Sequence, residues 1–278
     1  MRPPLVVLIA AVLSVNATTA NAHLRTHRFD AAGAMRWTRV QVDYGPRPAG
    51  SPASHALAER LRAALPDGRF QAVPGGLRNV IGHVPGRDPH DVVVVAAHYD
   101  TKDIPGFVGA NDGAAGTAVV LELARHLRPR ELRPTLVFAL FDGEESPDDT
   151  PDSEFEQKGL RGSKVAAKSL KDARAMILLD FIGLRNVSIP REESSDPVLW
   201  QLLRASARRV GAAAAFPSGT APEILDDHTP FEKLGVPAID LIDFNYPCFH
   251  RVCDDLSQVS ERSLNEIGET VRDLLPRL

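Results

Sequence analysis

Runs of apolar residues alternate with amphipathic segments along most of the chain. Residues 91–97, 135–141, 175–179 and 238–242 are apolar almost throughout, and residues 79–84 form a further strand candidate. Continuous apolar runs of this length are typical of strands that are covered on both faces of a sheet. These segments therefore predict a central sheet.

Helical patterns fall between and around these runs. We expect helices over residues 117–127, 197–210 and 264–275, and two more within residues 30–65. The two early helices are separated by residues 45–51, which are too rich in Pro and Gly to be helical. Strands that alternate with helices predict an α/β fold, a single doubly wound domain with a mostly parallel central sheet flanked by helices.

The length and net charge of the chain favour one large domain and do not favour a nucleic-acid-binding protein. The chain has 278 residues, of which 44% are hydrophobic, and this is enough for one large domain with a core. The formal net charge is -4, and no block of basic residues stands out. Nucleic acid is therefore not expected as a partner.

The first residues resemble a secretory signal. Arg2 precedes an apolar stretch over residues 5–13, and Ala20-Asn21-Ala22 fits a cleavage site. We expect a signal peptide over residues 1–22, a mature catalytic domain over residues 23–278, and a secreted or periplasmic location. The apolar stretch is too short to span a bilayer, so an uncleaved interfacial anchor is the alternative, and no transmembrane helix is expected in the mature chain.

The only two cysteines, Cys248 and Cys253, lie on either side of His250. In an oxidising compartment a pair this close can form a disulfide. The spacing does not match the paired Cys-x-x-Cys pattern of metal sites. A disulfide or two buried thiols are therefore expected rather than metal ligation.

Polar side chains follow the predicted strands. His98 and Asp100 come after the first buried run and face the same way, so they suit a metal ligand and the carboxylate that orients it. Asp112 lies in a Gly-rich turn and is either a helix N-cap or a metal ligand. A solvated strand end is the simpler alternative for His98.

Three carboxylates occupy positions where burial is costly. Glu144 and Glu145 follow the second run, and Asp180 follows the third. Unpaired buried carboxylates are unfavourable, which suggests metal binding by one glutamate and proton transfer by its neighbour. The alternatives are a solvated acidic turn for the glutamates and a structural salt bridge for Asp180.

The last strand is flanked by Asp226, His228 and His250. His228 suits a ligand, a capping residue or a substrate contact. Asp, Glu and His side chains that converge at the carboxyl ends of parallel strands favour zinc over calcium or magnesium. The chain has no Gly-x-Ser-x-Gly, Gly-x-Gly-x-x-Gly or P-loop pattern, so serine acyl transfer and nucleotide binding lack support.

Taken together, these residues resemble the zinc aminopeptidase family that also includes the glutaminyl cyclases. The resemblance runs from about Phe29 to near the C-terminus. It rests on an ordered set of short motifs: Gly45-Pro46-Arg47-Pro48, His98-Tyr99-Asp100, Asn111-Asp112-Gly113, Asp142-Gly143-Glu144-Glu145, Leu179-Asp180, Asp226-Asp227-His228-x-Pro230-Phe231 and His250.

The resemblance implies a role for each matching residue. In an aminopeptidase, Asp112 would bridge two zinc ions, with Glu145 and His250 on one and His98 and Asp180 on the other. In a cyclase, a single zinc would lie on Asp112, Glu145 and His250. The remaining residues complete the implied site: Glu144 as the proton-transfer group, Asp180 and Asp226 as an acidic network, Phe249 and Asp240 in the substrate pocket, and Asp100 and His228 behind the ligands.

A glutaminyl-peptide cyclotransferase acting on peptide or protein N-termini is our leading hypothesis. Asp142-Gly143-Glu144-Glu145 and the stretch over residues 237–247 look like bacterial cyclases. Those cyclases usually have Trp before the last His, where this chain has Phe249, and a second pocket Trp is absent. A two-zinc aminopeptidase is the alternative, and a catalytically inactive binding domain is a third hypothesis.

Overall fold

The computed structural model describes residues 29–129, 132–147 and 150–278. The predicted signal peptide, residues 1–22, lies outside the described residues. Within them, no helix is both long enough and apolar enough to cross a membrane.

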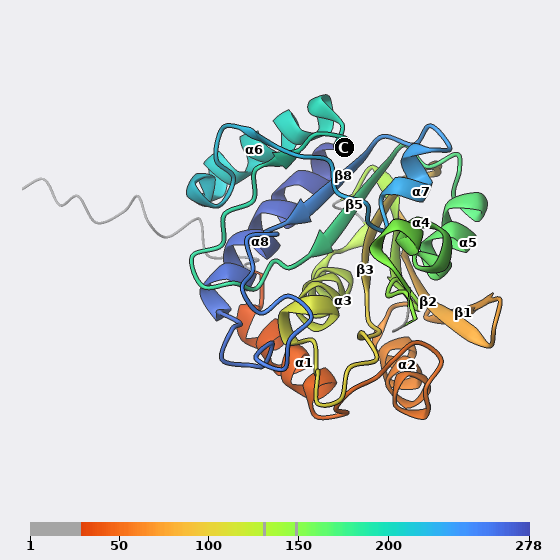
Figure 1. Cartoon of the computed structure of the whole chain (residues 1–278). Helices are drawn as coiled ribbons and strands as arrows, with labels where there is room; N and C mark the ends of the chain where they lie inside the picture. The colour runs from red at the N-terminus through yellow and green to blue at the C-terminus, as the bar shows by residue number, and fades with distance from the viewer. Residues whose placement is uncertain (1–28, 130–131, 148–149) are drawn as a thin grey trace, which may run out of the picture.

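A six-stranded mixed sheet forms the centre of the molecule, in the order β1-β2-β4-β3-β5-β8 (Figure 1). β3 pairs in parallel with β4 and β5, and β5 pairs in parallel with β8. β1 and β2 are antiparallel to their neighbours. The six strands are β1 Arg69–Val73, β2 Leu77–Val84, β3 Asp88–His98, β4 Pro134–Phe141, β5 Ala175–Asp180 and β8 Ala238–Ile242.

Helices cover both faces of this sheet. Val93 and Val95 of β3 face a large core with α1, α2, α3, α6 and α8, whereas Val94 and Ala96 face a smaller core with α5 and α7. This two-sided burial is the reason why β3 reads as a continuous apolar run. The helices are α1 Ala31–Val42, α2 Pro52–Ala64, α3 Gly116–His126, α4 Phe155–Lys158, α5 Arg161–Ser169, α6 Pro197–Val210, α7 Thr229–Glu232 and α8 Glu261–Leu274.

The predicted α/β class and the mostly parallel, helix-flanked sheet are confirmed, but several elements were missed. β1 is an edge strand with mostly exposed or half-buried residues, so it carries no apolar run. α5 is nine residues long and α7 only four, too short for a clear helical period. A small parallel pair, β6 Arg191–Glu192 and β7 Thr220–Ala221, lies outside the main sheet.

The cysteine pair forms a disulfide, Cys248–Cys253. Of the alternatives that the sequence left open, the bridge is therefore the one observed. It lies in the loop between β8 and α8, a segment without regular helix or strand.

Candidate metal centre

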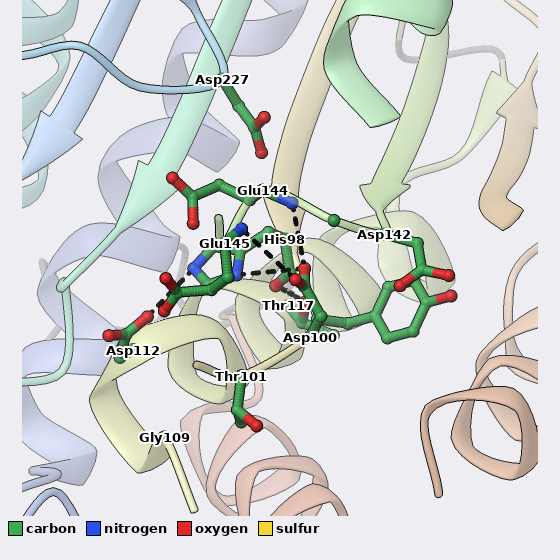
Figure 2. A network of polar contacts seen from close by, with 12 residues as sticks. His98, Asp100, Thr101, Gly109, Asp112, Thr117, Asp142, Glu144, Glu145 and Asp227 are labelled. Carbon is green, nitrogen blue, oxygen red and sulfur yellow. Dashed lines mark hydrogen bonds and ion pairs between the residues drawn. The ribbon is translucent and has the colours of Figure 1, made fainter. Parts of the chain in front are cut away.

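The parallel strands bring the predicted site residues to one edge of the sheet. His98 ends β3, Asp180 ends β5, and Glu144 and Glu145 follow β4. Because parallel strands point the same way, their carboxyl ends meet at the same edge. Residues that are far apart in the sequence thus lie side by side (Figure 2).

Two three-residue groups share Asp112. The Nε2 atom of His98 lies 3.3 Å from Oδ1 of Asp112 and 3.4 Å from Oδ1 of Asp180. The Nε2 atom of His250 lies 3.2 Å from Oε1 of Glu145 and 3.7 Å from Oδ2 of Asp112. In each group the candidate ligand atoms lie within 4.8 Å of one another, which is compact enough for a metal ion.

A local departure from helical geometry presents Asp112 to both groups. Asp112 has φ -83° and ψ 98°, and Gly113 has φ +89°, inside the π-helical turn Ala110–Ala115 that precedes α3. A Cβ atom on Gly113 would lie 3.1 Å from Cε1 of His98 and 3.0 Å from the backbone oxygen of Asp100. Glycine is therefore required here both by the positive φ and by the close approach of the His98 ring.

Asp100 ties three site residues together. Its Oδ1 atom accepts a hydrogen bond from the Glu144 backbone N–H and its Oδ2 atom accepts one from the Glu145 N–H, both at 3.3 Å. Oδ1 also lies 3.6 Å from Nδ1 of His98. A carboxylate behind the histidine fixes which ring nitrogen faces the cluster. Figure 2 shows these contacts converging on Asp100.

Charge and burial set the protonation of the cluster. Burial, followed by the charge of Glu145, raises the pKa of Asp112 to about 7. Burial also opposes ionisation of Glu145, but the hydrogen bond and charge of His250 outweigh it and lower the Glu145 pKa. For His98, burial is outweighed by Asp100, Asp112 and Asp180, which together raise its pKa well above the usual value.

The donor set fits a zinc ion. Among the described residues, three buried atoms in these groups have no regular hydrogen bond and face only one another's ionisable partners: Nε2 of His98, Oδ2 of Asp112 and Oε1 of Glu145. Buried polar atoms normally have partners, so atoms left without one inside these two groups indicate a place for a cation. Mixed imidazole and carboxylate donors suit zinc.

Glu144 lies beside the cluster but belongs to neither three-residue group. Its side chain is 8% exposed, and Figure 2 shows it opposite Asp227. Burial, followed by the charge of Glu145, raises the pKa of Glu144 well above the usual carboxyl value. Glu144 is thus poised to hold a proton next to the candidate ligands.

A buried acidic group extends behind Glu144. Asp226 and Asp227 precede α7, and Asp240 lies on β8 beside β5. Among the described residues, neither carboxylate oxygen of Asp240 has a hydrogen-bond partner. Burial raises the pKa of Asp227 to about 7 and that of Asp226 and Asp240 well above the usual value. This group can therefore share protons rather than carry a full set of charges.

Asp240, predicted in the substrate pocket, lies beside His228, predicted behind the ligands. Both side chains are fully buried, and Nδ1 of His228 lies 3.8 Å from Oδ2 of Asp240. Nε2 of His228 lies 3.0 Å from the Ser194 hydroxyl.

Aromatic rings form one wall of the site. The ring of Phe249 stacks on His250 with a centroid distance of 3.9 Å, and Phe244 and Phe181 pack around Phe249. Phe249 is 38% and Phe244 49% exposed, so this wall is open to a ligand. Trp200 packs on Phe216, away from these rings.

Sequence reasoning missed two residues that hold the site in place. Arg47 is fully buried and donates hydrogen bonds to the backbone oxygens of Tyr99, Val108 and Gly109. Asp254 is also fully buried and accepts hydrogen bonds from the backbone N–H groups of Asn111 and Asp112. Arg47 belongs to the Gly45-Pro46-Arg47-Pro48 motif, but the sequence indicated no function for it. Asp254 lies in no motif or apolar run that would have marked it as part of the site.

A model of peptidase family M28 matches residues 79–275, most of the chain. The chain belongs to peptidase family M28. Its matched segment contains every residue of the two three-residue groups that share Asp112. The predicted family resemblance is therefore confirmed.

Relatives in this family have different names and lengths. The chain is 27% identical to aminopeptidase YwaD of Bacillus subtilis over 214 residues, which cover 70% of this chain but only 43% of that protein. It is 26% identical to a glutaminyl-peptide cyclotransferase of Bothrops jararaca, covering 80% of this chain and 75% of that one. The chain thus spans less than half of the aminopeptidase.

A solved glutaminyl cyclase of Bacteroides thetaiotaomicron, bound to N-acetylhistamine, has the same fold. The TM-score is 0.80 at 25% identity, and the alignment covers 91% of this chain and 99% of that chain. The M28 enzymes similar to this chain therefore include both peptidases and cyclases. The choice between these reactions depends on the site.

Proposed function

We propose that this protein is a zinc-dependent glutaminyl-peptide cyclotransferase, which converts the N-terminal Gln of a peptide to pyroglutamate and releases ammonia. The observation that carries this proposal is Glu144, buried beside the metal cluster, together with the wall of Phe249 and Phe244 next to His250 against which a peptide N-terminus can pack and exclude water. Cyclisation needs one group that accepts a proton and then returns it. Glu144 is placed to do both.

In this proposal Asp112, Glu145 and His250 would hold one zinc ion. When bound, zinc would polarise the side-chain amide carbonyl of the substrate Gln as a Lewis acid. Asp112 and Glu145 supply negative charge, and the Phe249 ring restricts the movement of His250. Asp100 fixes the backbone of Glu144 and Glu145 by accepting hydrogen bonds from their N–H groups.

Proton transfer follows from the position of Glu144. The substrate's neutral α-amine attacks the side-chain amide carbon, and a C–N bond forms. In its ionised form Glu144 takes one proton from this amine and returns it to the departing nitrogen as the original C–N bond breaks, so the products are the lactam and ammonia. Besides burial, the nearby charge of Asp226 raises the pKa of Glu144, and that of Asp180 raises the pKa of Asp226, so this acidic group favours a proton on one of its carboxyls.

The aromatic wall contributes positioning. Phe249 and Phe244 offer apolar surface next to His250, against which a peptide N-terminus can pack and exclude water. Because the reaction is intramolecular, holding the amine near the amide supplies much of the rate. Exclusion of water also suppresses hydrolysis of the same amide.

A two-zinc aminopeptidase is the second candidate. It is favoured by the second group, in which His98 and Asp180 could hold another ion that shares Asp112 with the first. Glu144 would then activate water for attack on the first peptide bond. The two candidates therefore use the same residues with different attacking groups.

The deciding experiment is mass spectrometry of peptides incubated with the zinc-loaded protein. Gln-leading peptides should lose the mass of ammonia, whereas matched Leu-leading peptides should remain unchanged. Stepwise removal of N-terminal residues from both sets would instead establish the aminopeptidase. The Glu144→Gln variant is the control for a contaminating activity.

We also propose that residues 1–22 act as a secretory leader and that residues 23–278 form the catalytic domain. The support is the leader-like pattern of the sequence and the oxidised cysteine pair, since disulfides persist in oxidising compartments. N-terminal sequencing of the protein exported from its native host tests this proposal. A mature N-terminus near His23 is expected, and an intact Met1 would contradict it.

A further inference from the structure

The loop from Cys248 to Asp254, here named the His250 loop, carries a candidate ligand that lies neither at a strand end nor in the turn before α3. It lies between β8 and α8, and none of its residues belongs to a helix or strand. His250 has φ +51°, a left-handed conformation that side chains other than Gly rarely adopt. Something other than regular secondary structure must therefore keep its imidazole beside Glu145.

The disulfide closes this loop around the ligand. Cys248 and Cys253 are five positions apart, and His250 lies between them. Within the His250 loop, the Arg251 N–H donates to the Cys248 backbone oxygen at 3.0 Å, and the Asp254 N–H, just past the ring, donates to the Arg251 oxygen at 2.9 Å. A cross-link over so short a segment removes conformations in which His250 would point away from the cluster.

Asp254, at the end of the His250 loop, contacts the turn that carries Asp112. Oδ2 of Asp254 accepts a hydrogen bond from the Asp112 N–H at 3.0 Å, and Oδ1 accepts from the Asn111 N–H at 2.8 Å. The Tyr246 hydroxyl also donates to Oδ1 at 2.6 Å. Thus the disulfide ring encloses His250, and Asp254, directly after Cys253, holds the backbone N–H of Asp112.

We propose that the Cys248–Cys253 disulfide and Asp254 act together as positioning residues that set the affinity of the Asp112–Glu145–His250 site for zinc. The inference rests on the proposed zinc centre but not on which reaction the protein catalyses. The bridge orders the His250 loop before metal binding, so less conformational entropy is lost when zinc binds. Residues that orient ligands typically change metal affinity by about 10–100-fold.

The test measures zinc affinity by competition with a chromophoric chelator, without turnover. The double variant Cys248→Ser/Cys253→Ser should bind zinc about 10–100-fold more weakly than the parent protein. Its kcat should return to the parent value at saturating zinc, because the reacting groups are unchanged. Ile267→Val, a buried change on α8, is the control: it should lower the thermal midpoint but leave zinc affinity unchanged.

A second variant tests the link to Asp112. Asp254→Asn places an amide N–H₂ near a backbone N–H donor, and it should weaken zinc binding by a similar factor. If both features act through one loop, the combined variant should lose less affinity than the product of the separate losses.

Two outcomes would overturn the proposal. The first is zinc affinity within about twofold of the parent in the double variant, with only a lower thermal midpoint, which would make the disulfide a support of the fold alone. The second is fully multiplicative losses, which would mean that the bridge and Asp254 act separately. A parent protein that binds no zinc would instead refute the zinc centre of the proposed function.

Discussion

Glu144 and Glu145 are neighbours in the chain, yet their pKa values are displaced in opposite directions. Both are buried, but only Glu145 contacts His250, at 3.2 Å. His250 stabilises the Glu145 carboxylate and lowers its pKa, whereas burial and the charge of Glu145 raise the pKa of Glu144. A pair of adjacent carboxyls whose environments separate their pKa values is suited to two different roles.

The Glu144→Gln substitution tests this division. Activity should fall at least about 10²–10⁴-fold, because the variant has no proton-transfer group, while bound zinc should remain at the parent level. Metal analysis of the purified variant, together with its turnover rate, provides the measurement. His250→Ala is the matched change on a proposed ligand and should lose zinc. Loss of zinc from Glu144→Gln would contradict the assignment.

Arg47 is a second residue whose effect can be measured. Replacement by Met keeps the apolar stem but removes the donors to the three backbone oxygens, which would stay buried without partners. We expect the free energy of unfolding to fall by about 3 kcal/mol or more in urea titrations. Arg39→Met, at an exposed position of α1, is the control and should change stability by less than about 0.5 kcal/mol.

Glu232 gives the protein a pH-dependent stability. Burial raises its pKa from 4.5 to about 7, so between these values the folded state binds more protons than the unfolded state. Stability should therefore fall as pH rises from about 4.5 to 7, by roughly 2 kcal/mol from this group after allowance for its partial exposure.

The Glu232→Gln variant should flatten this part of the pH profile. Unfolding in urea at several pH values, in parent and variant, measures the difference. Glu261→Gln, at an exposed position in the first turn of α8, should keep the parent profile. A parent protein whose stability rises across this pH window, with an unchanged slope in Glu232→Gln, would refute the assignment.

At the scale of elements, close packing of α3 on β5 places Asp112 next to Asp180. Gly116, the first residue of α3, has ordinary helical dihedral angles. A Cβ atom there would lie 2.1 Å from the backbone oxygen of Leu179. The helix can therefore approach the strand this closely only with Gly at this position.

The Gly116→Ala substitution has two opposing effects on the free energy of unfolding. Helix propensity alone favours Ala by about 1 kcal/mol, but the clash involves backbone and should cost more than this gain. We expect a net loss of about 2 kcal/mol in the free energy of unfolding. Gly45→Ala, which meets no atom within 4 Å but has φ +74°, should cost only about 1 kcal/mol. A more stable Gly116→Ala protein would contradict the packing argument.

Element prediction succeeded where burial produces a strong local pattern. The runs in β3, β4, β5 and β8 are apolar because helices cover both faces of the sheet. β1 was missed because an exposed edge strand has no such constraint. Apolar periodicity therefore reports how an element is buried and only indirectly what element it is.

At the scale of the whole molecule, the buried carboxylates of the site oppose folding when no cation is present. Removal of zinc by a chelator should lower the thermal midpoint, because zinc binds the folded site and not the unfolded chain. At free zinc about 1,000 times the dissociation constant, the stabilisation is about 4 kcal/mol, or roughly 10 °C. Differential scanning calorimetry with and without chelator measures this shift. An unchanged midpoint would argue against a zinc centre.

The sequence by itself determined the α/β class, the family and the identity of the polar residues at strand ends. These features depend on local periodicity and on short ordered motifs, which one chain displays without any knowledge of long-range pairing. The disulfide and the parallel pairing of the central strands were among the alternatives that the sequence already allowed.

Only the tertiary structure decided how those residues meet. It placed His250, from a loop without regular structure, against Glu145 and Asp112, and it put Asp254 and Arg47 behind them. Such contacts depend on the order of the strands and on the path of loops across the sheet edge. Local sequence does not encode these distances, because the residues involved are brought together by burial of the whole core.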